Sequence, residues 1–83
     1  MNTILITLYV PALAQQFELF IPEDVPLAEL MPVIVDGIYT MSSYRYKSSG
    51  EELLCREETG LLKQRELTAR EYHIRNGEHL VLI

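Results

Sequence analysis

The longest regular pattern in the sequence is a set of apolar residues that recur every three or four positions between residues 26 and 41. This spacing places the apolar residues on one stripe of a helix. The stripe consists of Leu27, Leu30, Ile34, Ile38 and Met41. Because an apolar stripe needs a layer to cover it, the pattern predicts one main helix over about 26–41 that packs on a sheet.

Two prolines bear on the start and the shape of this helix. Pro26 suits a first helical position, because its fixed φ fits the helix and its missing N–H would have had no intrahelical partner. The carboxylate of Asp24 is expected to hydrogen-bond the free N–H groups of the first turn. Pro32 lies inside the helix, where it removes the hydrogen bond to Ala28 at a cost of about 3 kcal/mol. We therefore predict that the helix is kinked at Pro32 but not broken.

A β-hairpin is predicted ahead of the helix. Residues 3–10 and 15–21 alternate in side-chain type with the period of two that is typical of strands. The four residues between them interrupt the alternation and are expected to form the turn. The face predicted to point into the core carries Ile4, Ile6, Leu8, Phe17, Leu19 and Ile21.

Three shorter strands are predicted after the helix, over residues 52–56, 61–62 and 79–83. Residues 42–50 have turn composition, with two tyrosines and two cations, and are predicted to form an exposed connection. The first and last strands are expected to be parallel neighbours, joined through the helix by a right-handed crossover. The chain is therefore predicted to be an α+β fold in which one helix covers one face of a mixed sheet of four to five strands.

Length and charge narrow the classes of function. At 83 residues the chain is expected to form a single domain over 1–83. Its net charge of -5 argues against nucleic acid as a partner, because phosphate binding relies on clustered Lys and Arg. No apolar run approaches the roughly 20 residues of a membrane span, so direct membrane insertion is not expected. The lone cysteine and the lack of a signal-peptide pattern favour the cytoplasm.

Few side chains are candidates for catalysis or metal binding. Cys55, His73 and His79 are the only cysteine and histidines, and their spacing lacks the short pairs of zinc sites. Cys55 follows Leu53 and Leu54 in a predicted strand and is interpreted as a small apolar side chain rather than a nucleophile. The acidic residues that flank 52–56 are typical of a solvated surface. We therefore expect no enzymatic activity, no cofactor and no metal site.

One feature of the predicted sheet indicates a binding surface. If the alternating residues named above face the helix, then four apolar residues lie on the opposite face, namely Leu5, Phe20, Val81 and Ile83. The open face of such a sheet is usually polar. Because apolar patches on a surface tend to be interaction sites, these four residues are the predicted protein-binding site.

Two segments resemble a known fold family. Residues 67–74 read Leu-Thr-Ala-Arg-Glu-Tyr-His-Ile, and together with 79–82 they resemble the corresponding stretch of the ubiquitin-like β-grasp fold. In that fold the tyrosine braces a loop and the following isoleucine enters the core, so the resemblance implies these roles for Tyr72 and Ile74. The helix segment 24–32 is similar to the ubiquitin-like domains of bacterial type VII (ESX) secretion. These are the small YukD/EsaB proteins and the N-terminal domain of the membrane component EccD.

The resemblance to YukD/EsaB implies a function. The expectation is a non-enzymatic adaptor or regulator of type VII secretion in the cytoplasm of a Gram-positive bacterium. Its partners would be membrane or ATPase components of the secretion system, and they would recruit it to the inner face of the membrane.

Two alternatives belong to other classes. Sulfur carriers and protein modifiers with this fold activate a C-terminal Gly-Gly, whereas this sequence ends in Leu82 and Ile83. A β-branched residue still inside a strand cannot extend into an enzyme in that way, which disfavours this alternative. The other alternative is a structural domain that associates with itself, and the sequence leaves the oligomeric state open.

Overall fold

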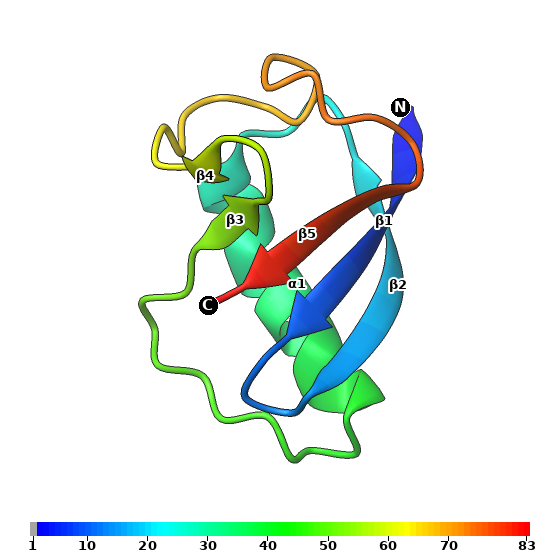
Figure 1. The fold of residues 1–83 in the computed structure, drawn as a ribbon, viewed down its shortest axis with the longest axis vertical. Coiled ribbons are helices and arrows are strands. Elements are labelled where there is room, and N and C mark those ends of the chain that lie inside the picture. The colour runs from blue at the N-terminus through cyan, green and yellow to red at the C-terminus, as the bar shows by residue number, and fades with distance from the viewer. Residues whose placement is uncertain (1) are drawn as a thin grey trace.

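The computed structural model describes residues 2–83. The elements are β1 (Thr3–Val10), β2 (Gln15–Pro22), α1 (Leu27–Met41), β3 (Leu54–Arg56), β4 (Gly60–Leu61) and β5 (Glu78–Leu82). The strands form one sheet in the order β2-β1-β5-β3-β4, and α1 lies across one face of it (Figure 1). The predicted α+β architecture, with one helix on a mixed sheet, is confirmed.

The centre of the sheet is the parallel pair of β1 and β5, as predicted. The hairpin of β1 and β2 is confirmed as well, and its register pairs Ile4 with Ile21. The turn between these strands is closed by a hydrogen bond of 3.0 Å from the Leu13 N–H to the Val10 carbonyl. β3 is shorter than predicted, with three residues instead of five, and β4 has the predicted two residues but begins one position earlier.

The helix runs without a break through Pro32, as predicted. Pro26 is its N-cap residue rather than its first helical residue, so α1 begins one position later than expected from the sequence, and no side chain caps the first turn. The prediction for Asp24 is therefore wrong. Asp24 instead forms an ion pair with Arg70, in which Nε lies 3.1 Å from Oδ1.

Backbone carbonyls from a distant loop cap the helix in place of Asp24. The Leu27 N–H donates to the Leu67 carbonyl at 2.9 Å, and the Ala28 N–H donates to the Arg65 carbonyl at 2.8 Å. The first N–H groups of a helix have no partner within it. The loop at 65–67 supplies these partners because the fold brings it across the start of α1.

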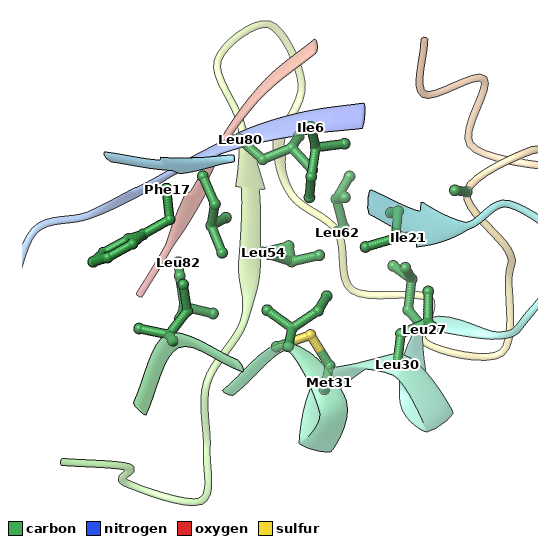
Figure 2. Close-up of a cluster of buried hydrophobic side chains, with 14 of the residues drawn as sticks. Ile6, Phe17, Ile21, Leu27, Leu30, Met31, Leu54, Leu62, Leu80 and Leu82 are labelled. Carbon is green, nitrogen blue, oxygen red and sulfur yellow. The ribbon is translucent and has the colours of Figure 1, made fainter. Parts of the chain in front are cut away.

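The hydrophobic core lies between α1 and the sheet (Figure 2). Its fully buried side chains come from the helix and from three strands, and the largest are Ile6, Leu8, Val10, Leu27, Ile38, Leu54, Leu80 and Leu82. The predicted helix stripe is confirmed except at its last member, because Met41 is 47% exposed. Met41 lies on the same stripe, but α1 ends there and no further layer covers it.

The sequence predicted that the connection after α1 is exposed, but the structure buries part of it. Tyr46 and Glu52 are buried, and the Tyr46 hydroxyl donates to Glu52 Oε2 at 2.9 Å. The Ser49 N–H donates to the same oxygen at 2.9 Å. Ser42 is also buried, and its Oγ accepts from the Tyr46 N–H at 3.1 Å. These contacts hold the middle of the connection against the core, while the residues between them stay exposed.

Candidate protein-interaction surface

The sheet face that points away from α1 is organised in rows of cross-strand neighbours. One row consists of Phe20 and Leu5. The next consists of Glu18, Thr7 and His79, and the third of Gln16, Tyr9, Val81, Cys55 and Leu61. Ile83 lies two residues beyond Val81 on the same face. Its N–H donates to the Leu53 carbonyl, and its carbonyl accepts from the Leu53 N–H. Residues in one row are close neighbours because directly opposed Cβ atoms are about 5 Å apart.

All four residues of the predicted binding site lie on this open face. Phe20 is 73% exposed and Ile83 is 55% exposed, while Leu5 and Val81 are half-buried. The register places Leu5 directly opposite Phe20, and we call this pair the Phe20 patch. Val81 and Ile83 lie together on the far side of the row that contains Thr7. The four residues therefore form two apolar areas with a polar row between them.

The area around Val81 is larger than the sequence indicated. Tyr9 and Cys55 flank Val81 on the neighbouring strands, and Leu61 lies beyond Cys55. Tyr9 and Leu61 are each 37% exposed. We call Tyr9, Cys55, Leu61, Val81 and Ile83 the Val81 patch. Strand alternation already put Tyr9 on this face, but β3 and β4 are too short for their own pattern to reveal which of their residues join it.

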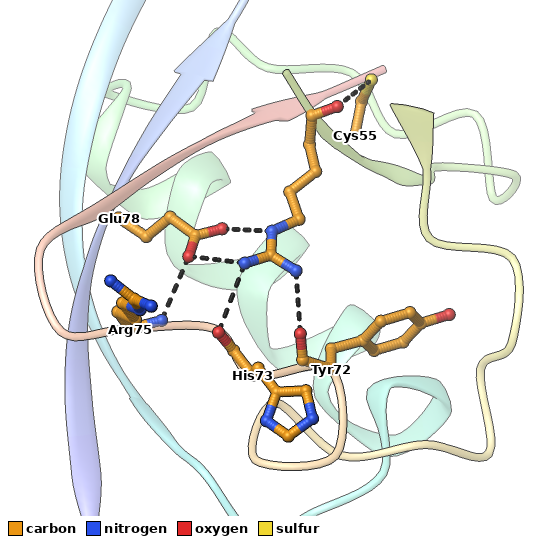
Figure 3. Close-up of polar contacts among 6 residues, drawn as sticks. Cys55, Tyr72, His73, Arg75 and Glu78 are labelled. Atoms are coloured by element: carbon orange, nitrogen blue, oxygen red, sulfur yellow. Dashed lines mark hydrogen bonds and ion pairs between the residues drawn. The ribbon is translucent and has the colours of Figure 1, made fainter. Parts of the chain in front are cut away.

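An ion pair joins Arg56 at the end of β3 to Glu78 at the start of β5 (Figure 3). Arg56 Nη2 donates to Glu78 Oε1 at 2.9 Å, and Nη1 donates to the Tyr72 carbonyl at 2.8 Å. The two charged side chains are only 19% and 18% exposed. Because a largely buried charge needs its partner, the pair holds β3, β5 and the loop at Tyr72 in one arrangement.

The electrostatics of Glu78 agree with this role. Burial by itself raises the pKa of the Glu78 carboxyl, but hydrogen bonds from Arg56 and from the Arg75 N–H, together with the charges of both arginines, lower it below 4.5 overall. The carboxylate is therefore held in its charged form at neutral pH, which keeps the ion pair with Arg56 intact.

Tyr72 and Ile74 have the positions that the family resemblance implied. The Tyr72 hydroxyl donates to the Gln64 carbonyl at 3.1 Å and accepts from the Gln64 N–H at 2.8 Å, so it braces the loop that contains Gln64. Ile74 is only 5% exposed and belongs to the core.

The remaining candidates for chemistry are not gathered into a reactive site. Cys55 is half-buried, and its Sγ donates weakly to the Arg56 carbonyl at 3.7 Å. His73, His79 and Glu78 are among the residues that line a polar hollow of about 390 Å³. Within residues 2–83, no group of three or more His, Cys, Asp or Glu side chains could hold a metal ion. In the same part of the chain, no helix has the length and apolar character to cross a membrane.

Comparison with known proteins identifies structural relatives only. No protein-family model and no curated protein matches this chain. The ubiquitin-like domain of the Mycobacterium tuberculosis type VII secretion protein ECCD1 matches with a TM-score of 0.78 and 16% identity, over 100% of this chain and 99% of that one. The UBL domain of Plasmodium falciparum Dsk2 matches with a TM-score of 0.71 and 15% identity, over 98% and 96%.

A third match is one chain of the MycP5-free ESX-5 inner membrane complex, with a TM-score of 0.68 and 12% identity. That match covers 100% of this chain but only 21% of the other, so this chain corresponds to a small part of that protein. At identities this low, the structural matches establish a shared fold and nothing more. The chain therefore has the ubiquitin-like β-grasp fold, and its resemblance to EccD ubiquitin-like domains is confirmed at the level of structure.

Proposed function

We propose that this protein is a non-enzymatic adaptor or regulator of type VII (ESX) secretion, similar to YukD/EsaB, that acts through contacts of its open sheet face. The observation that carries the proposal is the match of the whole chain to the ubiquitin-like domain of ECCD1. The sequence resemblance of the helix segment 24–32 to the same group of domains supports it independently.

The proposed partners are protein components of the secretion system. The match to one chain of an ESX-5 inner membrane complex favours a partner at the membrane. In this proposal the protein works in the cytoplasm of a Gram-positive bacterium and reaches the inner face of the membrane by binding that partner.

The two apolar patches of the open face are the proposed contacts. Phe20 has the physical properties of an anchor, because it is aromatic, 73% exposed and backed by Leu5. Aromatic anchors near the centre of an interface often contribute about 2 kcal/mol or more to binding. Val81 and Ile83 would be covered by the same partner if it spans the polar row between the patches.

The test uses charged replacements at two of these positions. Phe20→Glu and Val81→Lys should each weaken the capture of cytoplasmic parts of the secretion machinery in a pull-down, because a buried interface does not accept an unpaired charge. Thermal unfolding should show that Phe20→Glu changes stability by about 0.5 kcal/mol or less, as is usual at exposed sites, and that Val81→Lys, at a half-buried site, is less stable but still folded at the temperature of the pull-down. Val33→Lys is the matched control, because Val33 is 67% exposed on α1.

Each outcome of this experiment decides something. Wild-type capture by both Phe20→Glu and Val81→Lys, with folded proteins, would refute the role of the open face. Equal loss of capture in Val33→Lys would show that added charge on any surface is enough, and would also refute it.

A further inference from the structure

A groove runs between a flank of α1 and the connection that follows the helix. It has a volume of about 630 Å³. Its walls are formed by Pro32, Val35, Asp36 and Tyr39 on the helix and by Tyr44, Tyr46, Lys47 and Ser48 on the connection. The groove lies on the helix side of the fold, so it is separate from the open sheet face.

An aromatic pair forms one end of the groove. The ring centroids of Tyr39 and Tyr44 are 5.1 Å apart and their planes are tilted by 50°. Both rings are open to solvent, with exposures of 44% and 67%. Ser43 and Tyr44 both adopt the left-handed conformation, with φ values of 57° and 68°, which non-glycine residues rarely do. A hydrogen bond of 2.8 Å from the Tyr44 N–H to the Tyr39 carbonyl holds this conformation and so keeps the second ring beside the first.

The opposite wall is also held in place. The Tyr46 hydroxyl donates to the buried Glu52 carboxylate at 2.9 Å, and the Ser49 N–H donates to the same group. Lys47 and Ser48 lie between these anchored residues. Because the walls are ordered without a ligand, binding in the groove carries little ordering cost.

The shape of the groove suits an extended peptide. The connection runs back on the side of α1 after the helix ends (Figure 1). Tyr44 lies beside Tyr39, and Ser48 lines a neighbouring hollow together with Pro32. From Pro32 to Tyr39 the helix rises by about 10 Å, at about 1.5 Å per residue. Polyproline II rises about 3.1 Å per residue, so about three residues, or one turn, fill this length.

The chemistry of the walls favours the same ligand. Polyproline II has no internal hydrogen bonds, so its carbonyls are free to accept from tyrosine hydroxyls. Grooves lined by aromatic rings are a recurring mode of recognition for proline-rich segments. Here the rings of Tyr39 and Tyr44, with Val35 and Pro32, provide the apolar surface for proline rings.

Two unpaired charges give the ligand a direction. Asp36 lies on the helix wall and Lys47 on the wall formed by the connection. Neither side chain has an ion-pair partner among residues 2–83. A complementary peptide carries a basic residue for Asp36 and an acidic residue for Lys47 on either side of its proline-rich core.

We propose that the groove between α1 and residues 44–48 binds a proline-rich segment of a partner protein in the polyproline II conformation, flanked by one basic and one acidic residue. The proposal does not depend on the function assigned to the open sheet face. It gives the protein a second, independent interaction surface.

The test is fluorescence anisotropy with the full chain and a labelled peptide, Arg-Pro-Pro-Pro-Glu, whose three prolines match the length of the groove. Saturable binding is expected, and Tyr44→Ala should weaken it about tenfold or more, as is typical of an aromatic anchor. Tyr9→Ala is the matched control, because Tyr9 is an exposed tyrosine on the open sheet face. Lys47→Glu should weaken binding too, and Phe20→Glu should leave it unchanged. Amide shifts in NMR spectra should change mainly over residues 32–48.

Several results would overturn the proposal. Equal binding of a peptide with glycine in place of every proline would refute recognition of polyproline II. Unchanged binding by Tyr44→Ala would refute the groove, and if that variant does not fold, Lys47→Glu and the amide shifts decide the same question. Concentration-dependent self-association that Tyr44→Ala abolishes would identify a second copy of this chain as the occupant, and would also overturn it.

Discussion

The contact between Tyr46 and Glu52 should be a main source of stability for the long connection after α1. Tyr46→Phe removes only the hydroxyl and leaves the buried ring in place. The lost hydrogen bond is 2.9 Å long and ends on a carboxylate that is 6% exposed. Tyr46 itself is 7% exposed, so water cannot easily replace the missing donor.

The ionisation of the two groups sets the magnitude. Burial, the hydrogen bond to Glu52 and the charge of Glu52 raise the pKa of Tyr46 to about 12. Burial also acts to raise the pKa of Glu52, but hydrogen bonds from Ser48, Tyr46 and the backbone outweigh it and lower the pKa overall. At pH 7 the bond therefore joins a neutral hydroxyl to a charged carboxylate. Hydrogen bonds to charged groups contribute about 1.5–3 kcal/mol, and we expect Tyr46→Phe to lower the free energy of unfolding by that amount.

This loss is large for a chain of 83 residues. At about 0.05–0.15 kcal/mol per residue, its total free energy of unfolding is about 4–12 kcal/mol. The pKa of Tyr46 is raised in the folded state, so its contribution is fully present below pH 10 and is lost as pH rises through about 12. A measurement at pH 7 therefore records the whole effect.

Equilibrium unfolding in urea, followed by far-UV circular dichroism, measures this free energy. Tyr44→Phe is the matched control, because Tyr44 is 67% exposed and its loss of a hydroxyl should change stability by about 0.5 kcal/mol or less. A double-mutant cycle with Glu52→Ala isolates the pair. The reasoning is refuted if Tyr46→Phe is as stable as Tyr44→Phe, or if its full effect persists when Glu52 is already replaced.

Three further predictions concern the core and the buried charges. Leu30→Ala and Ile34→Ala should each lower the free energy of unfolding by about 2–5 kcal/mol, because both side chains are buried under the sheet, and urea curves like those of the wild type would show that the helix faces another way. Arg56→Met should lower it by about 3 kcal/mol, since it leaves the largely buried Glu78 carboxylate without its ion-pair partner. Adding Glu78→Leu should recover most of the loss, and no recovery in urea unfolding would contradict this. The pKa values of Glu52 and Glu78 are lowered in the folded state, so stability should be constant above about pH 5 and fall as pH drops below 4.5; thermal melts should record this fall, and it should be smaller in Glu52→Gln and Glu78→Gln.

The elements that the sequence predicted well are those whose own residues carry the periodicity. The helix over 27–41 and the strands β1 and β2 each contain enough residues for a spacing of three to four, or of two, to be unambiguous. The same alternation assigned Phe20 and Val81 to the face away from the helix, and the structure has them there. Their role in binding stays a prediction. β3 and β4 were harder to define, because three and two residues are too few for a period.

Other features depended on contacts between segments far apart in the chain. The first turn of α1 was expected to be capped by Asp24, but the carbonyls of Arg65 and Leu67 reach its N–H groups instead. A residue next to the helix competes with any backbone that the fold brings nearby, and local sequence does not reveal that competitor. Tyr46 illustrates the same point, because its surroundings in the sequence are polar while its side chain contacts the core.

The sequence by itself determined the type of fold and the face of each long strand, since both follow from the spacing of side chains along a regular backbone. Only the tertiary structure decided how the open face is divided. The register of β1 against β2 and β5 sets Thr7 and His79 between Phe20 and Val81, and so separates the two apolar patches. Register depends on the pairing of several strands at once, and a shift of one residue moves every side chain to the other face. The groove beside α1 arises in the same way, because it exists only where the connection returns along the helix.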